Sequence, residues 1–323
     1  LFEVWNEPNL KSFWRGTRAD YFTLYQHTAH ALKDMDDGLH VGGPATAQNA
    51  WITPFLDFCE ANDLPADFVS THHYPTDAFG HPGDDTEAQL AESTRSVLRD
   101  RARRSHMQAR GRPLYYTEWN TSSNSRDPLH DEPYAAPVVV KTMLEATGLV
   151  DGYSFWTFSD IFEENYFPWS PFHGGFGLLN LYGVAKPSYR AFELLHALGT
   201  DLVGAWSDQH DTVDAWAVRR PAGLTLMLTN HALPRHPITT ERVRIRLDGA
   251  PEASGATITR IDAEHANAKA RWIELGQPAY PSASQVDDLH EASRLVAEPQ
   301  PCDHRDGALW VDVTLPPNAV ASV

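Results

Sequence analysis

Short apolar runs alternate with longer amphipathic stretches over the first 198 residues. Runs of about five apolar or β-branched residues are typical of buried strands, whereas apolar residues three or four apart over a longer stretch predict helices. The runs that predict strands are 1–5, 39–43, 68–72, 114–119 and 153–158. The stretches that predict helices are 18–35, 51–62, 86–108, 132–147 and 187–198. Repeated strand–helix units predict a parallel sheet with right-handed crossovers, most economically a (β/α) barrel, of which five units are visible where a closed barrel has eight.

The pattern changes after residue 198. Alternating or continuously apolar runs between Gly and Pro turns predict strands at 212–219, 224–230, 242–247, 257–261 and 309–315. Residues 263–297 interrupt them with helix-like sequence, including 284–296. We therefore expect two domains in an α/β chain. A partial (β/α) barrel covers residues 1–198, and a β-sandwich with a helical insertion at about 263–297 covers residues 199–323.

The net charge of the chain limits the classes of partner that it can bind. Lys and Arg number 26 against 43 Asp and Glu, so the formal net charge is −17, which repels nucleic acid phosphates and anionic membrane surfaces. No apolar run approaches the roughly 18 residues of a membrane span. Cys59 and Cys302 form neither a disulfide framework nor a CxxC motif, and their redox state is left open. We expect no nucleic acid and no membrane partner.

The chain starts with Leu1 directly in a predicted strand. We therefore expect further residues to precede it, and the sequence predicts no localisation. Five strand–helix units alone leave a barrel sheet open, with unpaired edge strands. On this basis a chain of these residues alone is expected to be poorly stable and a poor catalyst.

Two glutamates follow apolar strands in motifs rich in polar and aromatic residues. Glu7 lies in Trp-Asn-Glu-Pro-Asn at 5–9, and Glu118 lies in Thr-Glu-Trp-Asn at 117–120. Functional side chains of a parallel barrel gather at the carboxyl ends of its strands. A single glutamate after a strand is equally consistent with a solvated loop residue. Two glutamates at the mouth of the same barrel are the arrangement that a glycosidase needs. One carboxyl group protonates the leaving oxygen and the other attacks the anomeric carbon.

These motifs resemble the retaining glycosidases of the large (β/α)8 clan, and the chain as a whole resembles glycoside hydrolase family 39 and its bacterial β-xylosidases. The stretches that carry the resemblance are 70–77, 155–164, 172–179, 262–267 and 291–293. The resemblance implies that the five units are about strands 4 to 8 of a (β/α)8 barrel. It also implies a retaining enzyme that releases xylose from the non-reducing ends of xylo-oligosaccharides by double displacement. The alternatives are another activity of the family, such as α-L-iduronidase, which looks less similar over 155–164, or a truncated chain without activity.

The resemblance also implies roles for individual residues. Glu7 is expected as the acid/base, Glu118 as the nucleophile and Asn6 as the partner of the sugar 2-hydroxyl. Tyr74 is expected to contact the nucleophile. His72 is expected in the substrate site, although the adjacent histidines and Tyr74 could equally form a loop network.

Three more residues are expected to bind the sugar. Trp156 offers a flat aromatic face for the ring, although a tryptophan on an apolar strand is by default part of the core. Glu163 and Glu164 are expected to accept hydrogen bonds from the remaining hydroxyls. Such an acidic pocket suits neutral xylose and disfavours a uronate. The segment 173–177 is expected to form a turn with a positive φ that supports the site.

The chain has sixteen histidines, a residue type that often binds metals. Apart from the adjacent pair at 72–73, their spacing offers no convincing ligand motif on a helix face. We therefore expect no metal and no cofactor. The expected partner is a xylo-oligosaccharide or another small glycoside, and a homo-oligomer remains open.

Overall fold

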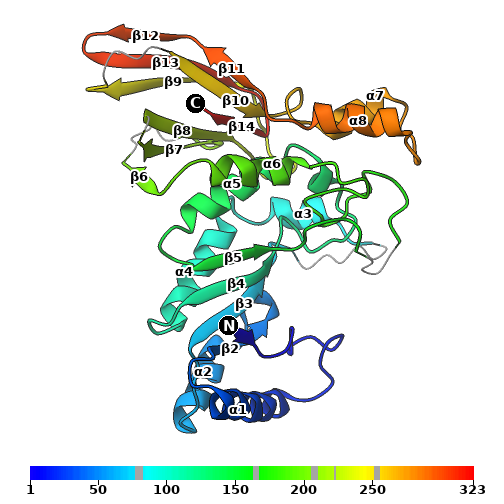
Figure 1. Ribbon diagram of the computed structural model, residues 1–323, viewed down its shortest axis with the longest axis vertical. Helices are drawn as coiled ribbons and strands as arrows, with labels where there is room; N and C mark the ends of the chain where they lie inside the picture. Colours follow the sequence, from blue (N-terminus) through cyan, green and yellow to red (C-terminus); the bar gives the residue numbers. More distant parts are fainter. Residues whose placement is uncertain (77–82, 163–166, 205–209, 222, 251–254) are drawn as a thin grey trace. The chain divides into compact units, whose positions relative to one another are not determined.

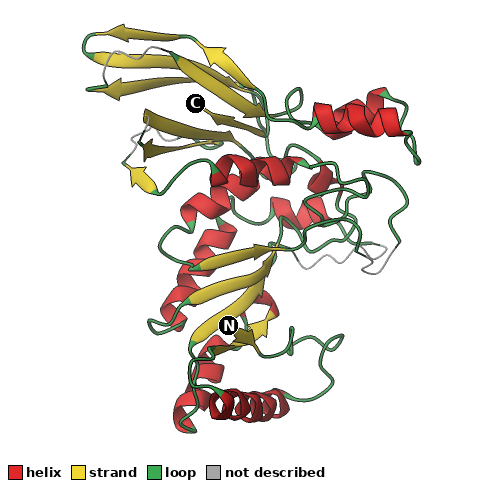
Figure 2. Cartoon of the chain, viewed as in Figure 1, coloured by secondary structure: helices red, strands yellow, loops and turns green. Residues whose placement is uncertain are grey.

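The computed structural model describes residues 1–76, 83–162, 167–204, 210–221, 223–250 and 255–323 (Figures 1 and 2). The chain divides into two compact units. The first unit comprises Leu1–Pro75, Ser96–Ser123 and Glu145–Trp156. The second unit comprises Thr76–Arg95, Asn124–Leu144 and Thr157–Val323.

The first unit is built on a five-stranded parallel sheet in which the strands lie in chain order, β1-β2-β3-β4-β5 (Figure 1). Its strands are β1 (Phe2–Glu3), β2 (Val41–Thr46), β3 (Phe68–His73), β4 (Leu114–Trp119) and β5 (Gly152–Phe155). The predicted fold class, an α/β chain with part of a parallel barrel, is confirmed. The outer strands are shorter than predicted, and β1 stops early because Trp5 takes a left-handed backbone with φ 68°.

Helices cover one face of this sheet. They are α1 (Arg18–Met35), α2 (Ile52–Ala61) and α4 (Val97–Gln108), and Ala47–Asn49 adds a 3-10 turn. Thr17 and Asp20 form a capping box at the start of α1, with each side chain accepting the other's backbone N–H. Side chains of these helices share one apolar core with residues of the sheet, among them Val69 and Tyr116.

One predicted helix is wrong. The stretch 86–108 forms two helices, α3 (Thr86–Ala91) in the second unit and α4 in the first. At the break, the Ser93 hydroxyl donates to the Leu90 carbonyl at 2.8 Å. Such a local side-chain hydrogen bond competes with the continuation of the helix.

The second unit contains two antiparallel sheets. The larger has the order β11-β10-β14-β8-β7-β6 and the smaller β12-β13-β9. The strands are β6 (Asp201–Val203), β7 (Val213–Arg220), β8 (Gly223–Asn230), β9 (Glu241–Asp248), β10 (Ala256–Ile261), β11 (Ala297–Gln300), β12 (Cys302–Arg305), β13 (Ala308–Leu315) and β14 (Ala319–Ser322). Leu228 and Ile258 of the larger sheet share a core with Val313 of the smaller, as in a β-sandwich.

Helices complete the second unit. They are α3, the 3-10 turn Pro128–Asp131, most of α5 (Ala135–Glu145), α6 (Pro187–His196), α7 (Ala268–Glu274) and α8 (Ala283–Ala292). The last two form the predicted insertion between strands, and Trp272 and Leu289 share a core with Phe172. The sequence prediction missed the short strands β6, β11, β12 and β14. The domain boundary at residue 198 stays a prediction. Within the described residues, no helix combines the length and apolarity needed to cross a bilayer.

Candidate active site

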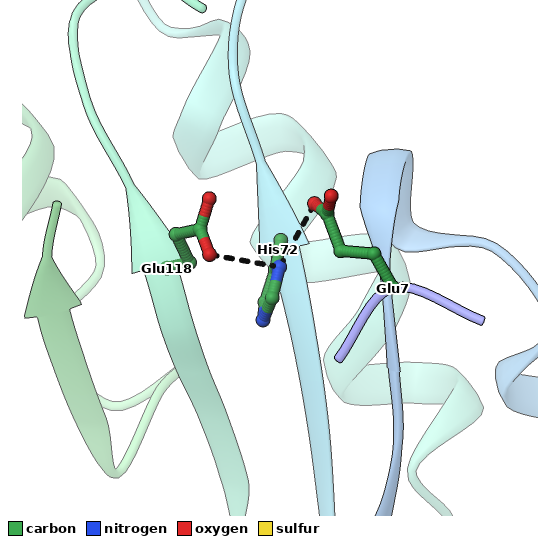
Figure 3. A group of neighbouring side chains, drawn as sticks. All are labelled: Glu7, His72 and Glu118. Atoms are coloured by element: carbon green, nitrogen blue, oxygen red, sulfur yellow. Dashed lines mark hydrogen bonds and ion pairs between the residues drawn. The ribbon is translucent and has the colours of Figure 1, made fainter. Parts of the chain in front are cut away.

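Glu7, His72 and Glu118 meet in the first unit, with the imidazole between the two carboxylates (Figure 3). His72 Nδ1 lies 2.9 Å from Glu7 Oε1 and 3.4 Å from Glu118 Oε2. One oxygen of each glutamate and a nitrogen of the imidazole all lie within 4.8 Å of one another. His72 and Glu7 are buried, whereas Glu118 is partly exposed. The two glutamates singled out in the sequence therefore face each other.

The loop after β1 places Glu7. Trp5 and Glu7 both have left-handed backbones, with φ 68° and 44°, a conformation that a residue other than glycine keeps only where its surroundings impose it. The surroundings here are the loop after β2. Glu7 N–H donates to the Ala45 carbonyl at 2.8 Å. The Asn9 amide donates to the Ala47 carbonyl at 3.1 Å and accepts from the Ala47 N–H at 2.9 Å.

Asn9 is a functional-site residue that the sequence analysis did not single out. Its side chain replaces a backbone partner for Ala47 and ties two sheet-edge loops together. An asparagine two residues after the glutamate in a loop motif is the available signal, because Asn side chains commonly hydrogen-bond backbone groups in loops.

An irregularity in β4 aims Glu118. The pairing of β4 with β3 shifts register between Thr71 and His72, which places Glu118 opposite His72. Tyr116 lies in the core under the helices, whereas Thr117 Oγ1 donates to Glu3 Oε2 at 2.6 Å. In a regular strand Glu118 would share the face of Tyr116. The extra residue of the bulge turns the carboxylate to the face of His72 instead.

Tyr74 holds the second oxygen of Glu118. Its phenol donates to Glu118 Oε1 at 2.6 Å, while Oε2 faces His72 at 3.4 Å. Both carboxylate oxygens therefore have a neighbour that limits rotation. The contact between Tyr74 and Glu118 is the one that the resemblance implied.

The alternation of β3 separates the two adjacent histidines. His72 points to Glu7 and Glu118, and His73 points to the opposite face. His73 is buried, and neither ring nitrogen has a hydrogen-bond partner among the described residues. Burial, reinforced by the charge of Arg101, lowers the pKa of His73 to about 3. Only the first of the two histidines belongs to the candidate site.

The pKa of His72 shifts the other way. Burial is the largest single effect and disfavours the imidazolium. The hydrogen bond to Glu7 and the negative charges of Glu118, Glu7 and Glu3 together outweigh it, so the pKa of His72 is raised above its usual range. A protonated His72 would donate to one carboxylate and carry a positive charge between the two.

We expect this histidine to make stability fall at alkaline pH. A raised folded-state pKa contributes stability that is fully present below the unfolded value of about 6.5 and is lost as the pH rises through the folded value. The melting-temperature difference between wild type and His72→Asn should thus shrink from pH 5.5 to pH 8.5, measured by circular dichroism.

His73→Asn is the matched control with the opposite sign. Because folded His73 stays neutral to about pH 3, it opposes folding below the unfolded pKa of about 6.5. Its removal should relieve acid sensitivity. Equal pH profiles for the two variants would contradict the assignment of opposite pKa shifts.

Two further predicted sugar-binding residues, Asn6 and Trp156, are not drawn into this cluster. Asn6 is exposed, and no hydrogen bond joins its side chain to another described residue. Trp156 is half-buried. Its backbone N–H donates to the Trp119 carbonyl at 2.9 Å, and its backbone carbonyl accepts from the side-chain amide of Asn120. Glu163 and Glu164 lie outside the described residues. The roles of all four stay predictions.

The cluster also has the donor types of a cation site, because ligand atoms of two carboxylates and an imidazole all lie within 4.8 Å of one another. However, His72 Nδ1 already makes a hydrogen bond to Glu7. A cation on that nitrogen would have to replace the hydrogen bond. The absence of a metal stays a prediction that treatment with EDTA tests.

A parallel half-barrel with two facing glutamates at its strand ends is the architecture of a (β/α)8 glycosidase. The family model of Glycosyl hydrolases family 39 matches residues 1–309. The chain belongs to glycosyl hydrolase family 39.

Two curated relatives are beta-xylosidases. That of Caldicellulosiruptor saccharolyticus is 46% identical over 301 residues, which are 92% of this chain and 62% of the relative. That of Geobacillus stearothermophilus is 34% identical over all of this chain and 65% of its own length. The chain thus spans less than two thirds of both relatives.

Solved structures agree with the family. The GH39 enzyme from Xanthomonas axonopodis pv. citri has a TM-score of 0.82 and 31% identity, covering 99% of this chain and 67% of that one. A monomeric beta-xylosidase from Caulobacter crescentus has a TM-score of 0.79 and 32% identity, covering 100% of this chain and 68% of that one.

Proposed function

We propose that the natural protein containing this chain is a retaining β-xylosidase that releases xylose from the non-reducing ends of xylo-oligosaccharides. The observation that carries the proposal is the approach of a Glu7 oxygen to within 4.8 Å of a Glu118 oxygen. Retaining glycosidases need carboxyl groups about 5 to 5.5 Å apart, whereas inverting enzymes need about 6.5 to 9.5 Å to accommodate a water molecule.

In the first step, a Glu118 oxygen attacks the anomeric carbon as the bond to the leaving oxygen breaks, and Glu7 gives its proton to that oxygen. In the second step, Glu7 takes a proton from water, the water oxygen attacks the same carbon, and the bond to Glu118 breaks. The product keeps the configuration of the substrate because the carbon is inverted twice.

Glu118 and Glu7 differ in ways that suit these roles. Glu118 accepts a hydrogen bond from Tyr74 and is partly exposed, so its oxygens are oriented and can be reached. Glu7 is buried and shares a hydrogen bond with His72. His72 contacts both groups. Its interactions with the two carboxylates can therefore adjust as Glu7 loses its proton and takes it back.

The substrate is proposed from the relatives and the acidic site. Both curated relatives are beta-xylosidases. We assign Asn6 to the sugar 2-hydroxyl, Trp156 to the ring face, and Glu163 and Glu164 to the other hydroxyls. Carboxylates around a neutral pentose accept hydrogen bonds, whereas they repel the carboxylate of a uronate.

A panel of nitrophenyl glycosides tests the proposal on the natural protein. The β-xyloside is expected to be hydrolysed fastest, and NMR during the reaction should show β-xylose forming first. Faster hydrolysis of an α-iduronide, or first formation of α-xylose, would contradict it. The panel is repeated after treatment with EDTA, which should leave the rate unchanged. A rate restored only by added cation would assign the two glutamates and His72 to a metal.

A further inference from the structure

Glu7 lies outside the regular strands of the parallel sheet. β1 comprises only Phe2–Glu3 and pairs with β2 at two positions, so the strand ends before it reaches Glu7. Glu118, by contrast, lies within β4 and pairs with His72 of β3. The backbone of Glu7 therefore needs contacts other than a sheet ladder to fix the position of its carboxyl group.

The residues that supply such contacts belong to the segment 45–51, which we call the β2 loop. The Glu7 N–H donates to the Ala45 carbonyl at 2.8 Å. Two residues further along the chain, the Asn9 side chain binds Ala47 twice. Its amide donates to the Ala47 carbonyl at 3.1 Å, and its oxygen accepts from the Ala47 N–H at 2.9 Å. One side chain thus fixes both the separation and the orientation of the two segments.

The β2 loop is itself held by the core of the first unit. The Thr71 hydroxyl of β3 donates to the Thr46 carbonyl at 3.0 Å. The side-chain amide of Asn49 donates to the Ser105 hydroxyl of α4 at 3.0 Å and to the Tyr116 hydroxyl of β4. Because two strands and a helix hold the β2 loop, it can serve as a fixed support for the segment that carries Glu7.

Both sides of this contact have left-handed backbones. Trp5 and Glu7 have them on one side, and the β2 loop has them with φ between 52° and 60° at Ala45, Gln48, Asn49 and Trp51. This conformation is unfavourable for residues other than glycine and persists only where the surroundings impose it. Without the hydrogen bonds between the two segments, the backbone of Glu7 would relax and its carboxyl group would move.

The burial of Ala47 makes the contact with Asn9 costly to lose. Ala47 is buried, and without the Asn9 side chain its N–H would lose its acceptor. A buried N–H without an acceptor is unfavourable, so the backbone would have to shift to find another partner. Such a shift would act on the segment of Glu7 and leave Glu118, which is held by β3 and by the Tyr74 phenol.

We propose that Asn9 is a positioning residue for the acid/base: its side chain holds the segment of Glu7 on the β2 loop, so that the Glu7 carboxyl group is placed to protonate the leaving oxygen. The inference rests on the proposed role of Glu7 as the acid/base, but not on xylose in particular. Asn9 acts through the backbone that it holds, and the placement of the nucleophile does not depend on it.

The test compares Asn9→Leu with Asn230→Leu in the natural protein. Leucine has nearly the shape of asparagine but forms no side-chain hydrogen bond. Asn230 of β8 is a buried asparagine of the second unit, and its amide donates to the Thr239 and Leu315 carbonyls at 2.8 and 3.0 Å. Both variants therefore remove an asparagine that holds backbone groups, and thermal unfolding measures the loss of stability in each.

The activity readout is kcat/KM with two substrates of the sugar that the nitrophenyl panel selects, its disaccharide and its dinitrophenyl glycoside. We expect Asn9→Leu to lower kcat/KM for the disaccharide by about tenfold to a hundredfold, the effect of misplacing a reacting group. For the dinitrophenyl glycoside it should change by less than about threefold, because that leaving group departs without a proton. Asn230→Leu should lower the melting temperature and change kcat/KM equally for both substrates.

A second variant separates the two hydrogen bonds of Asn9. Asn9→Asp keeps the acceptor for the Ala47 N–H and loses the donor to the Ala47 carbonyl. Its loss on the disaccharide should lie between those of wild type and Asn9→Leu, again with little effect on the dinitrophenyl glycoside. If Asn9→Leu does not fold, Asn9→Asp decides by the same ratio of the two losses.

Two outcomes overturn the inference in distinguishable ways. With an active wild type, equal losses on both substrates in the folded Asn9 variants, or the same ratio of losses in Asn230→Leu, would make Asn9 purely structural. A wild type that hydrolyses no glycoside of the panel would overturn the proposed function, and this inference with it.

Discussion

Replacing Glu118 by alanine is expected to reduce xyloside hydrolysis by at least about 10⁴-fold, whatever the leaving group. The reason is that every substrate must form a bond to the nucleophile, whatever its leaving group. Initial rates with nitrophenyl xylosides of different leaving-group pKa check this. Glu3→Gln is the matched control, because Glu3 is a carboxylate of the same unit, on strand β1, that accepts a hydrogen bond from the Thr117 hydroxyl. It should lose less than about tenfold.

Azide distinguishes the two glutamates by the product. In Glu118→Ala the azide ion can take the place of the missing carboxylate and displace the leaving group once, so the product should be the α-xylosyl azide. Rescue to the β-xylosyl azide would instead mean that Glu118 is the acid/base and that the two roles must be exchanged.

Replacing Glu7 by alanine is expected to have an effect that depends on the substrate. Hydrolysis of xylobiose should fall by about 10² to 10⁴-fold, the range for loss of a general acid. With a dinitrophenyl xyloside the first step should be nearly unchanged, because that leaving group departs without a proton. Pre-steady-state release of dinitrophenol and steady-state hydrolysis of xylobiose together measure the difference.

The second step provides the control. Without the base, the xylosyl-enzyme should accumulate on Glu118, and azide should release it as the β-xylosyl azide because two inversions have occurred. The intermediate can be identified by the mass of the peptide that contains Glu118. Equal losses on both substrates would contradict an acid/base role for Glu7.

Much of the local structure could be predicted from the sequence. The periodicity of α1 and its Thr17–Asp20 capping box involve neighbouring residues only, so α1 was predicted with its observed bounds. The apolar run of β4 was predicted equally well. The short strands were missed because they depend on partner strands and have little apolar pattern of their own. β12 reads Cys-Asp-His-Arg and is mostly exposed, so it has no apolar pattern, and only its partner β13 makes it a strand.

The motifs also predicted that Glu7 and Glu118 meet, because parallel strands bring their carboxyl ends to one edge. The orientation of the side chains depends on the tertiary structure. The register shift against β3 turns Glu118 away from the helix face, and the strand alternation selects His72 over His73. Asn9 gains its partner only on folding, since Ala47 lies 38 residues away in the chain. Local patterns depend on neighbours a few residues apart, whereas the aim of a carboxylate depends on backbone contacts that only the assembled sheet creates.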